Sequence, residues 1–258
     1  YNAMYEAGIT KFIPQFGHLP FVMGEGNKKL SKRDPESNLF HHRDRGFIPE
    51  GLLNYLALLG WSISADRDVF TLDEMVAAFD VTNVNPNPAR FDQKKADSIN
   101  ASHIRLLNPD DFINRIIPYL QAAGVISKEV SSTEREILVK AAPLIQERIV
   151  VLSEAVSMLD FLFKNSADIV IEDDAKAGLP EDSKAICEAA LQVLEAIDSS
   201  AFVTATIQEV LNKKLIEEMG QKPRNAFGPL RTAISGKRIS PPLFESMEIL
   251  GKEQTLAR

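Results

Sequence analysis

The stretch Pro49-Glu50-Gly51-Leu52-Leu53-Asn54-Tyr55-Leu56-Ala57-Leu58-Leu59-Gly60 carries the strongest signal for the fold class. Proline is favoured in the first turn of a helix, where its missing N–H would have no partner anyway. Four leucines then recur with the spacing of a helical face: Leu52, Leu53, Leu56 and Leu59. Gly60 can end the helix in the left-handed conformation. The stretch therefore predicts a helix with an apolar stripe that packs against other elements.

Helix starts are signalled repeatedly after this stretch. Two capping boxes, Thr71-x-x-Glu74 and Ser131-x-x-Glu134, predict starts because both side chains satisfy free backbone N–H groups. A proline followed by acids predicts two further starts, at residues 109–111 and 180–182. The chain is thus expected to continue as one helix after another.

Helix ends and interruptions are signalled by glycine and proline. Three glycines predict ends: Gly124, Gly220 and Gly251. The last of these follows a helix expected from about Leu243 to Leu250. Pro118 lies inside a helical pattern and predicts a bend or a break, because proline removes a backbone donor.

Strand signals are few. Phe21-Val22-Met23 is the best of them, and Val69-Phe70 is expected to pair briefly. The segment 83–88 contains two prolines, which exclude regular helix and predict an extended connector. The fold class is therefore predicted to be mainly α with a small mixed region at the start. Domain boundaries are expected near residues 107–110 and 165–168.

The composition is that of an ordinary globular protein, with 45% hydrophobic and 25% charged residues. A length of 258 residues suits two or three compact units. No apolar run is long enough to span a bilayer, so no membrane partner is expected. Cys187 is the only cysteine, which excludes an internal disulfide. We expect a packed thiol and a reducing, cytoplasmic location.

Charge is unevenly distributed along the chain, whose formal net charge is −7. Acids dominate from Ser166 to Ser200, and bases dominate from Gly220 to Arg258. The bases of this last segment are Lys222, Arg224, Arg231, Lys237, Arg238, Lys252 and Arg258. A local basic surface can bind phosphates while acids repel them elsewhere. The alternative is two solvated faces of opposite sign, and charge alone does not separate the two interpretations.

A second basic run, Lys28-Lys29-Leu30-Ser31-Lys32-Arg33, lies beside Gly24 and Gly26. Glycines let the backbone come close to a ligand. Ammonium groups on both sides of a hydroxyl can neutralise a polyphosphate as charge builds on its oxygens. A short basic run is, however, most often solvated surface, so both interpretations stay open for this run by itself.

The spacing Lys29-x-Ser31-Lys32 resembles the KMSKS loop of class I aminoacyl-tRNA synthetases. Further segments resemble bacterial glutamyl-tRNA synthetases, in that family's order. They are His18-Leu19-Pro20, Asn38-Leu39-Phe40, residues 46–62, Phe91-Asp92-x-x-Lys95, Asn100-Ala101-x-His103-Ile104, Pro229-Leu230-Arg231-x-Ala233-Ile234-Ser235-Gly236, Ser240-Pro241 and Leu250-Gly251-Lys252-Glu253. Leu30 departs from the loop's commoner methionine or isoleucine, which is a conservative apolar change.

The resemblance implies a mainly α fold, in which a small mixed α/β stem-contact region precedes two helical-bundle anticodon-binding subdomains. The implied segments are a remnant of the catalytic domain at 1–28, the KMSKS-like loop and stem-contact domain at 29–108, and anticodon-binding subdomains at 109–165 and 166–258. The family's HIGH motif, His-x-Gly-His, does not occur in this sequence. We therefore expect the C-terminal part of a glutamate–tRNA ligase, inactive by itself.

The resemblance also assigns chemistry to the basic loop. In intact relatives, glutamate attacks ATP, used with Mg²⁺, and the glutamyl group then passes to tRNA(Glu). Lys29, Ser31 and Lys32 are implied to hold the phosphates, and Lys32 is expected to be the main charge stabiliser. Arg33 either assists or is a surface arginine. No metal site of the protein's own and no tightly bound cofactor are expected.

The second half is implied to read the anticodon. Arg231 falls at a position that relatives use for anticodon contact, and Ser240-Pro241 marks an adjoining backbone site. The alternative for Arg231 is a salt bridge to an acid. Further RNA-binding candidates follow from charge and position: Arg224 and Arg148 for the anticodon, and Lys94, Lys95 and Arg105 for the inner corner of the tRNA.

Two other classes of function stay open at this point. One is a stand-alone tRNA-binding or regulatory helical module without ligase activity. The other is a helical scaffold that binds proteins rather than RNA. A monomer is expected for the ligase part. Whether tRNA(Gln) is also a partner depends on how the third anticodon base is read.

Overall fold

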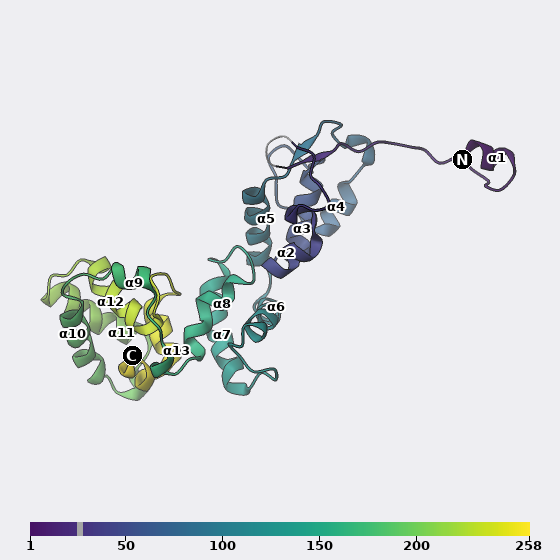
Figure 1. Ribbon diagram of the computed structural model, residues 1–258. Helices are drawn as coiled ribbons and strands as arrows, with labels where there is room; N and C mark the ends of the chain where they lie inside the picture. Colours follow the sequence, from purple (N-terminus) through teal and green to yellow (C-terminus); the bar gives the residue numbers. More distant parts are fainter. Residues whose placement is uncertain (25–27) are drawn as a thin grey trace. The chain divides into compact units, whose positions relative to one another are not determined.

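A computed structural model describes residues 1–24 and 28–258, and the chain divides into two compact units. Unit 1 comprises residues 1–43 and 49–100, and unit 2 comprises residues 44–48 and 101–258. Helices predominate in the ribbon diagram, which confirms the prediction of a mainly α fold (Figure 1). Gly26, which the sequence placed in the basic loop, lies outside the described residues.

Unit 1 combines short helices with a two-stranded sheet. Its helices are α1 (Asn2–Glu6), α2 (Leu39–Arg45), α3 (Pro49–Leu58), α4 (Leu72–Ala78) and α5 (Gln93–Leu106), with 3-10 turns η2 (Pro35–Ser37) and η3 (Val81–Asn83). The last residues of α2 and α5 belong to unit 2. Strands β1 (Val22–Met23) and β2 (Ala89–Arg90) pair in parallel, with Val22 opposite Ala89.

The helix predicted from Pro49 is α3, and it ends at Leu58. Leu52 and Tyr55 are buried as expected, whereas Leu53 and Leu56 are exposed. The prediction that Gly60 adopts the left-handed conformation was wrong, since Gly60 is not among the glycines with positive φ. The chain leaves α3 through a tight turn instead, in which the N–H of Trp61 donates to the carbonyl of Ala57 at 2.9 Å.

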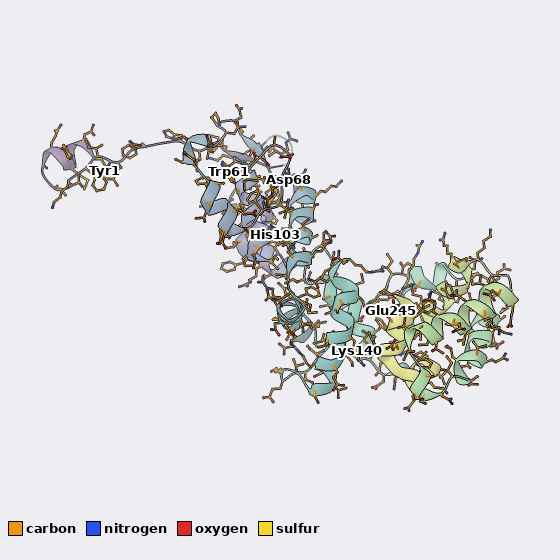
Figure 2. The ribbon with its side chains drawn as sticks, turned by 180° about the vertical axis from the view of Figure 1, so that it is seen from behind. Tyr1, Trp61, Asp68, His103, Lys140 and Glu245 are labelled. Atoms are coloured by element: carbon orange, nitrogen blue, oxygen red, sulfur yellow. The ribbon has the colours of Figure 1, made fainter. Side chains whose placement is uncertain are left out.

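The expected strand at Val69-Phe70 was also wrong. The N–H of Phe70 donates to the side-chain oxygen of Asn54 in α3 at 3.1 Å, so it is not available to a sheet. The Phe70 ring is buried and packs edge-on against the Trp61 ring. Figure 2 labels Trp61, and also Asp68 near this place in unit 1. The true partner of β1 is β2, which follows directly after Pro88 at the end of the predicted connector.

Unit 2 is a helical assembly around one continuous apolar core. Its elements are α6 (Pro109–Ala122), α7 (Ser132–Gln146), α8 (Glu154–Leu159), η4 (Asp160–Phe163), η5 (Ser166–Asp168), α9 (Asp173–Ala177), α10 (Ser183–Glu195), η6 (Ser199–Ala201), α11 (Thr204–Leu211), the π-helix η7 (Asn212–Glu218), α12 (Pro223–Ser235) and α13 (Leu243–Ala257). Helix α6 packs on α7 and α8, and α10 to α13 pack on one another (Figure 1). Helices α7 and α13, marked by Lys140 and Glu245 in Figure 2, are also in contact.

Both capping boxes form as predicted. At the start of α7, the Ser131 hydroxyl accepts from the N–H of Glu134 at 3.2 Å, and the Glu134 carboxylate accepts from the N–H of Ser131 at 2.7 Å. The same carboxylate accepts from the N–H of Ser127 at 2.8 Å. The hydrogen bonds from Ser131 and Ser127 lower the pKa of Glu134 to about 2.

Helix α6 ends at Ala122, just before Gly124, which has positive φ and marks the predicted end. Helix α6 continues through Pro118 to Ala122, so the predicted break does not occur. Its inward residues Ile113, Ile116 and Leu120 are fully buried, and this packing outweighs the hydrogen bond lost at proline. The helix predicted from about Leu243 to Leu250 is interrupted at Gly251 as expected, since the angles there, φ 77° and ψ 165°, are not helical; a second helical stretch follows this kink, and together they form α13 up to Ala257.

No helix in the described ranges is both long enough and apolar enough to cross a membrane.

Candidate functional sites

The basic loop of unit 1 lies beside β1 and outside any helix. The N–H of Leu30 donates to the carbonyl of Val22 at 2.8 Å, and the N–H of Gly24 donates to the carbonyl of Lys28 at 2.8 Å. Beyond Leu30, the N–H of Ser31 donates to the Asp34 carboxylate at 2.6 Å, which closes a turn. The loop is therefore held by its backbone and by the Asp34 carboxylate.

A cavity of about 370 Å³ opens next to this loop, lined by Gly24, Lys28, Lys29, Leu30, Asp34, Pro35, Glu36, Phe91 and Gln93. Lys29 thus contributes to the cavity, and its Nζ lies 3.9 Å from the centre of the Phe21 ring. Lys32 and Arg33 are exposed and do not line it, and the Ser31 hydroxyl accepts from the N–H of Arg33 at 3.2 Å. The structure brings Lys29 to the cavity, whereas the sequence favoured Lys32.

The stem-contact candidates differ in their surroundings. Lys94 is exposed, and Lys95 forms an ion pair of 3.1 Å with Asp68 within unit 1. Arg105 belongs to unit 2, where its Nε lies 3.3 Å from the Glu147 carboxylate. Both ion pairs are exposed and are easily exchanged for another anion, since surface pairs contribute little.

A cationic cavity of about 510 Å³ lies in unit 2. Three arginines line it: Arg224 and Arg231 from α12, and Arg238 from the turn that follows α12. The remaining wall is Ala175, Gly178, Leu179, Pro180, Pro223, Asn225, Phe227, Gly228 and Thr232. Arg224 and Arg238 are exposed, and in the part of the chain that the structure describes neither forms an ion pair. Three guanidinium groups beside an aromatic ring suit phosphates and unstacked bases.

The structure brings together Arg231, Ser240 and Pro241, which the resemblance had grouped. Nη1 of Arg231 reaches the Ser240 hydroxyl at 2.7 Å, the Ser240 carbonyl at 3.2 Å and the Pro241 carbonyl at 2.7 Å. Ser240 and Pro241 are themselves buried. The predicted alternative, a salt bridge to an acid, is replaced by these neutral acceptors.

The charge of Arg231 is only partly compensated. Burial lowers the pKa of Arg231, and the nearby positive charge of Arg148 lowers it further, while Glu245 acts in the opposite direction. Arg148 itself is exposed just beyond the end of α7. The positive charges of Arg231 and Arg148 together favour an anion at this place.

The basic segment from Gly220 to Arg258 is not one free surface, because several of its cations bind within unit 2. Lys252 donates to the carbonyls of Glu195 and Ile197 at the end of α10, at 2.9 and 2.7 Å. Arg258 donates to the carbonyls of Phe161 and Lys164 beyond α8, at 3.0 and 2.6 Å. Lys237 is also bound internally. These cations stabilise the negative ends of helices, a role that sequence spacing does not reveal.

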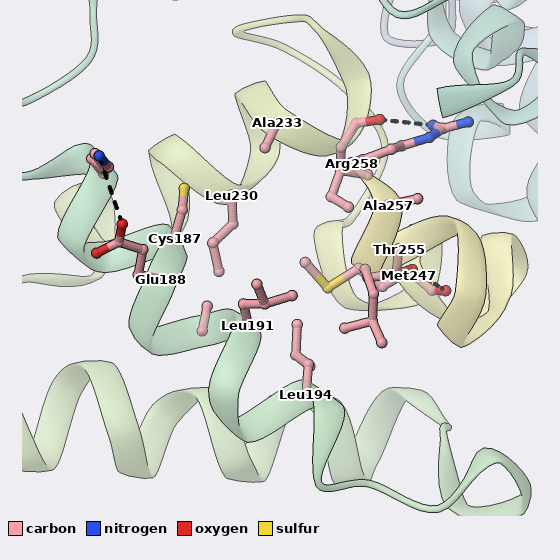
Figure 3. A pocket seen from close by; sticks show the side chains of 14 residues that line it. Cys187, Glu188, Leu191, Leu194, Leu230, Ala233, Met247, Thr255, Ala257 and Arg258 are labelled. Atoms are coloured by element: carbon pink, nitrogen blue, oxygen red, sulfur yellow. Dashed lines mark hydrogen bonds and ion pairs between the residues drawn. The ribbon is translucent and has the colours of Figure 1, made fainter. Parts of the chain in front are cut away.

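A second cavity of unit 2, of about 360 Å³, is mainly apolar. Figure 3 shows Cys187, Leu191 and Leu194 of α10 facing Leu230 of α12 and Met247 of α13 across it. Burial raises the pKa of the Cys187 thiol, which favours the predicted packed thiol over a nucleophile. No group of side chains able to hold a metal ion occurs among the described residues.

Comparisons with protein families match both parts of the chain. Residues 111–258 match the family model of the anticodon binding domain. Residues 1–98 match the model of the catalytic domain of class I tRNA synthetases of the E and Q type.

The chain is similar to curated bacterial proteins over its whole length. It is 62% identical to the glutamate–tRNA ligase of Leifsonia xyli subsp. xyli and 57% identical to that of Kocuria rhizophila, and covers 52% and 51% of these proteins. The crystal structure of a glutamate tRNA ligase from Elizabethkingia meningosepticum in complex with its amino acid matches 98% of this chain and 52% of that one, with a TM-score of 0.79 and 26% identity. The chain spans about half the length of the curated relatives it matches.

Proposed function

Since this chain belongs to the glutamate–tRNA ligase family, we propose that it is the part of such an enzyme that recognises tRNA(Glu). The intact enzyme would activate glutamate with ATP and Mg²⁺ and transfer the glutamyl group to the tRNA. These 258 residues contain no His-x-Gly-His, so by themselves they would bind RNA without charging it. Measurable charging by the purified chain would overturn that last expectation.

The cationic cavity of unit 2 is the observation that carries this proposal. Arg224, Arg231 and Arg238 converge on it from one helix and one turn, in a chain whose net charge is −7. Unstacked bases are read on their edges and held through their phosphates, which matches guanidinium groups beside Phe227. Ser240 and Pro241 support Arg231 at this site, and Arg148 adds charge next to it.

The other candidates take lesser parts in the same proposal. Lys29, Ser31 and Lys32, with Arg33 beside them, would hold the phosphates of ATP. Lys29 already lines a cavity, and Lys32, in the same loop, is exposed. Lys94, Lys95 and Arg105 would contact the backbone at the inner corner of the tRNA, where shape and phosphates dominate.

We further propose the organisation and location that the family implies. Residues 1–28 would complete a catalytic domain, 29–108 would form the stem-contact domain, and 109–165 and 166–258 would be two anticodon-binding subdomains. The protein would act as a monomer in the cytoplasm.

Titration of labelled tRNA(Glu) at two salt concentrations tests the proposal. If the three arginines of the cavity each neutralise one phosphate of the single-stranded anticodon, affinity should fall about 20-fold between about 50 and 200 mM salt. Arg135→Ala serves as a control for loss of an arginine elsewhere, because Arg135 is paired with Asp110 on α6 and does not line the cavity. This variant should bind with the affinity and salt dependence of the unchanged chain. An absence of binding at the lower salt would refute RNA recognition and favour a protein-binding scaffold. Competition with tRNA(Gln) then shows whether recognition extends to that tRNA.

A further inference from the structure

The turn of residues 236–242, between α12 and α13, connects the cationic cavity to α8 and η4. On one side it carries Arg238 and the groups of Ser240 and Pro241 that Arg231 binds. On the other side, the ammonium of Lys237 donates to the carbonyl of Ser157 at 2.5 Å and lies 2.7 Å from the Asp160 carboxylate.

This ion pair is largely shielded from water. The side chains of Lys237 and Asp160 are only 14% and 15% exposed. Asp160 also binds Lys164 at 2.7 Å. Burial raises the pKa of Asp160, but the hydrogen bonds and charges of Lys164 and Lys237 outweigh this and leave it below its ordinary value. Asp160 is therefore ionised at neutral pH. Removing Lys237 leaves the Asp160 carboxylate with Lys164 alone. Removing Asp160 leaves the shielded Lys237 ammonium with Glu172, at 4.0 Å, as its acidic partner.

Backbone contacts hold the start of the same turn. The carbonyl of Gly236 accepts from the N–H of Glu172 at 2.8 Å. The Ser235 hydroxyl accepts from the N–H of Lys237 at 3.2 Å and donates to the carbonyl of Arg231 at 2.7 Å. The turn is thus attached at two places. Its start is held near Lys237, and its end is held where Arg231 binds Ser240 and Pro241. Arg238 and Ile239 are exposed between these two attachments, Ile239 to 72%.

We propose that Lys237 is a positioning residue for RNA binding, which holds the turn so that Arg231 and Arg238 line the cationic cavity together. This inference rests on the proposed function. A direct contact between Lys237 and a phosphate is disfavoured, because its ammonium is shielded and already has the Ser157 carbonyl and the Asp160 carboxylate as partners. Lys237 acts through the arginines and does not itself touch the RNA.

Binding of tRNA(Glu) by Lys237→Met, Asp160→Asn and the double variant tests this inference. Each single substitution should weaken binding about tenfold. The double variant should bind no more weakly than the weaker-binding of the two single variants, because both substitutions remove the same attachment. The slope of log affinity against log salt should fall to the same extent in both single variants, because each loosens the turn that holds Arg238 at its phosphate. The matched control is Lys222→Met, an exposed lysine just before α12, outside the lining of the cavity.

Three results would overturn the inference. One is unchanged affinity in Lys237→Met below its melting temperature, which would make the ion pair merely structural. Another is a salt slope that is reduced by about one in Lys237→Met but unchanged in Asp160→Asn, which would indicate a direct contact between Lys237 and a phosphate. The third is stronger binding by Asp160→Asn, as expected if removing an acid simply raised the positive charge near the RNA. If the unchanged chain does not bind tRNA(Glu), the proposed function fails as well, and this outcome is distinct from the other three.

A fluorescent reporter gives a second readout that does not need RNA. Ile239→Trp places an indole at the exposed tip of the turn, and the emission of Trp61 in unit 1 is subtracted with the chain that lacks the reporter. Anisotropy should fall when Lys237→Met is added to this variant, and should not fall with Lys222→Met. Equal anisotropy in both combinations would contradict the role of Lys237. If Lys237→Met does not fold, Lys237→Gln, which keeps a donor without the charge, replaces it.

Discussion

Replacing Gly236 by alanine should destabilise unit 2 by about 3 kcal/mol. Gly236 ends α12 with φ of 74°, a left-handed conformation that costs an alanine about 1–2 kcal/mol. A Cβ at this position would lie only 2.2 Å from the carbonyl oxygen of Val170, so residues 170–172 must move. That movement breaks the hydrogen bond from the N–H of Glu172 to the Gly236 carbonyl, which contributes about 1 kcal/mol.

Urea unfolding followed by far-ultraviolet circular dichroism measures this effect. With a urea dependence of about 2–3 kcal/mol per molar, the midpoint of unit 2 should fall by about 1 M. Gly124→Ala is the matched control in the same unit, because Gly124 has φ of 69° but no atom within 4 Å of an added Cβ. The control should lose only the conformational part, about 1–2 kcal/mol. Equal losses in the two variants would refute the argument that the close approach to Val170 matters.

Three further predictions concern single side chains. Arg231→Ala should cost about 1–3 kcal/mol of tRNA(Glu) affinity in filter binding, as for a good polar contact to a base, and an unchanged affinity would remove Arg231 from the site. The pKa of Glu134 is lowered from 4.5 to about 2, so its stabilisation is present above pH 4.5 and is lost as the pH falls toward about 2. The urea midpoints of the unchanged chain and of Glu134→Gln should therefore converge as the pH falls, and a constant difference would contradict this. Cys187 should react with a disulfide reagent at less than about a tenth of its rate in the urea-unfolded chain, since burial raises the pKa of its thiol; equal rates would refute the packed-thiol assignment.

Local signals predicted the helix starts well, because all the donors and acceptors of a capping box lie within four consecutive residues. Thr71 and Ser131 form the predicted hydrogen bonds to Glu74 and Glu134. Signals that depend on distant partners were read less well. Val69-Phe70 has the composition of a strand, but Asn54 in α3 takes its N–H group. The partner of β1 at Ala89–Arg90 follows a proline-rich segment that carries no strand signal of its own.

The candidate sites show the same division. The family motif placed Arg231, Ser240 and Pro241 together, and the structure joins them by hydrogen bonds. Counting charges failed for Lys237, Lys252 and Arg258, because a cation that binds helix carbonyls more than fifty residues away looks in the sequence like a surface cation. Arg238 was counted only as one base among several. Its place in the cavity depends on the turn after α12, which no motif specified.

The bend of α13 at Gly251 determines where the last helical turns point. Its backbone angles, φ 77° and ψ 165°, are open almost only to glycine, although a Cβ there would meet no other atom. Glycine is therefore required at residue 251 by the backbone dihedral angles, and not by a lack of space for a side chain. Downstream of this one residue, Lys252 is directed to the carboxyl end of α10, and Arg258 is directed to the carbonyls of Phe161 and Lys164, in and just after η4. A straight α13 would carry both cations past these acceptors, so two separate tertiary attachments depend on one pair of dihedral angles.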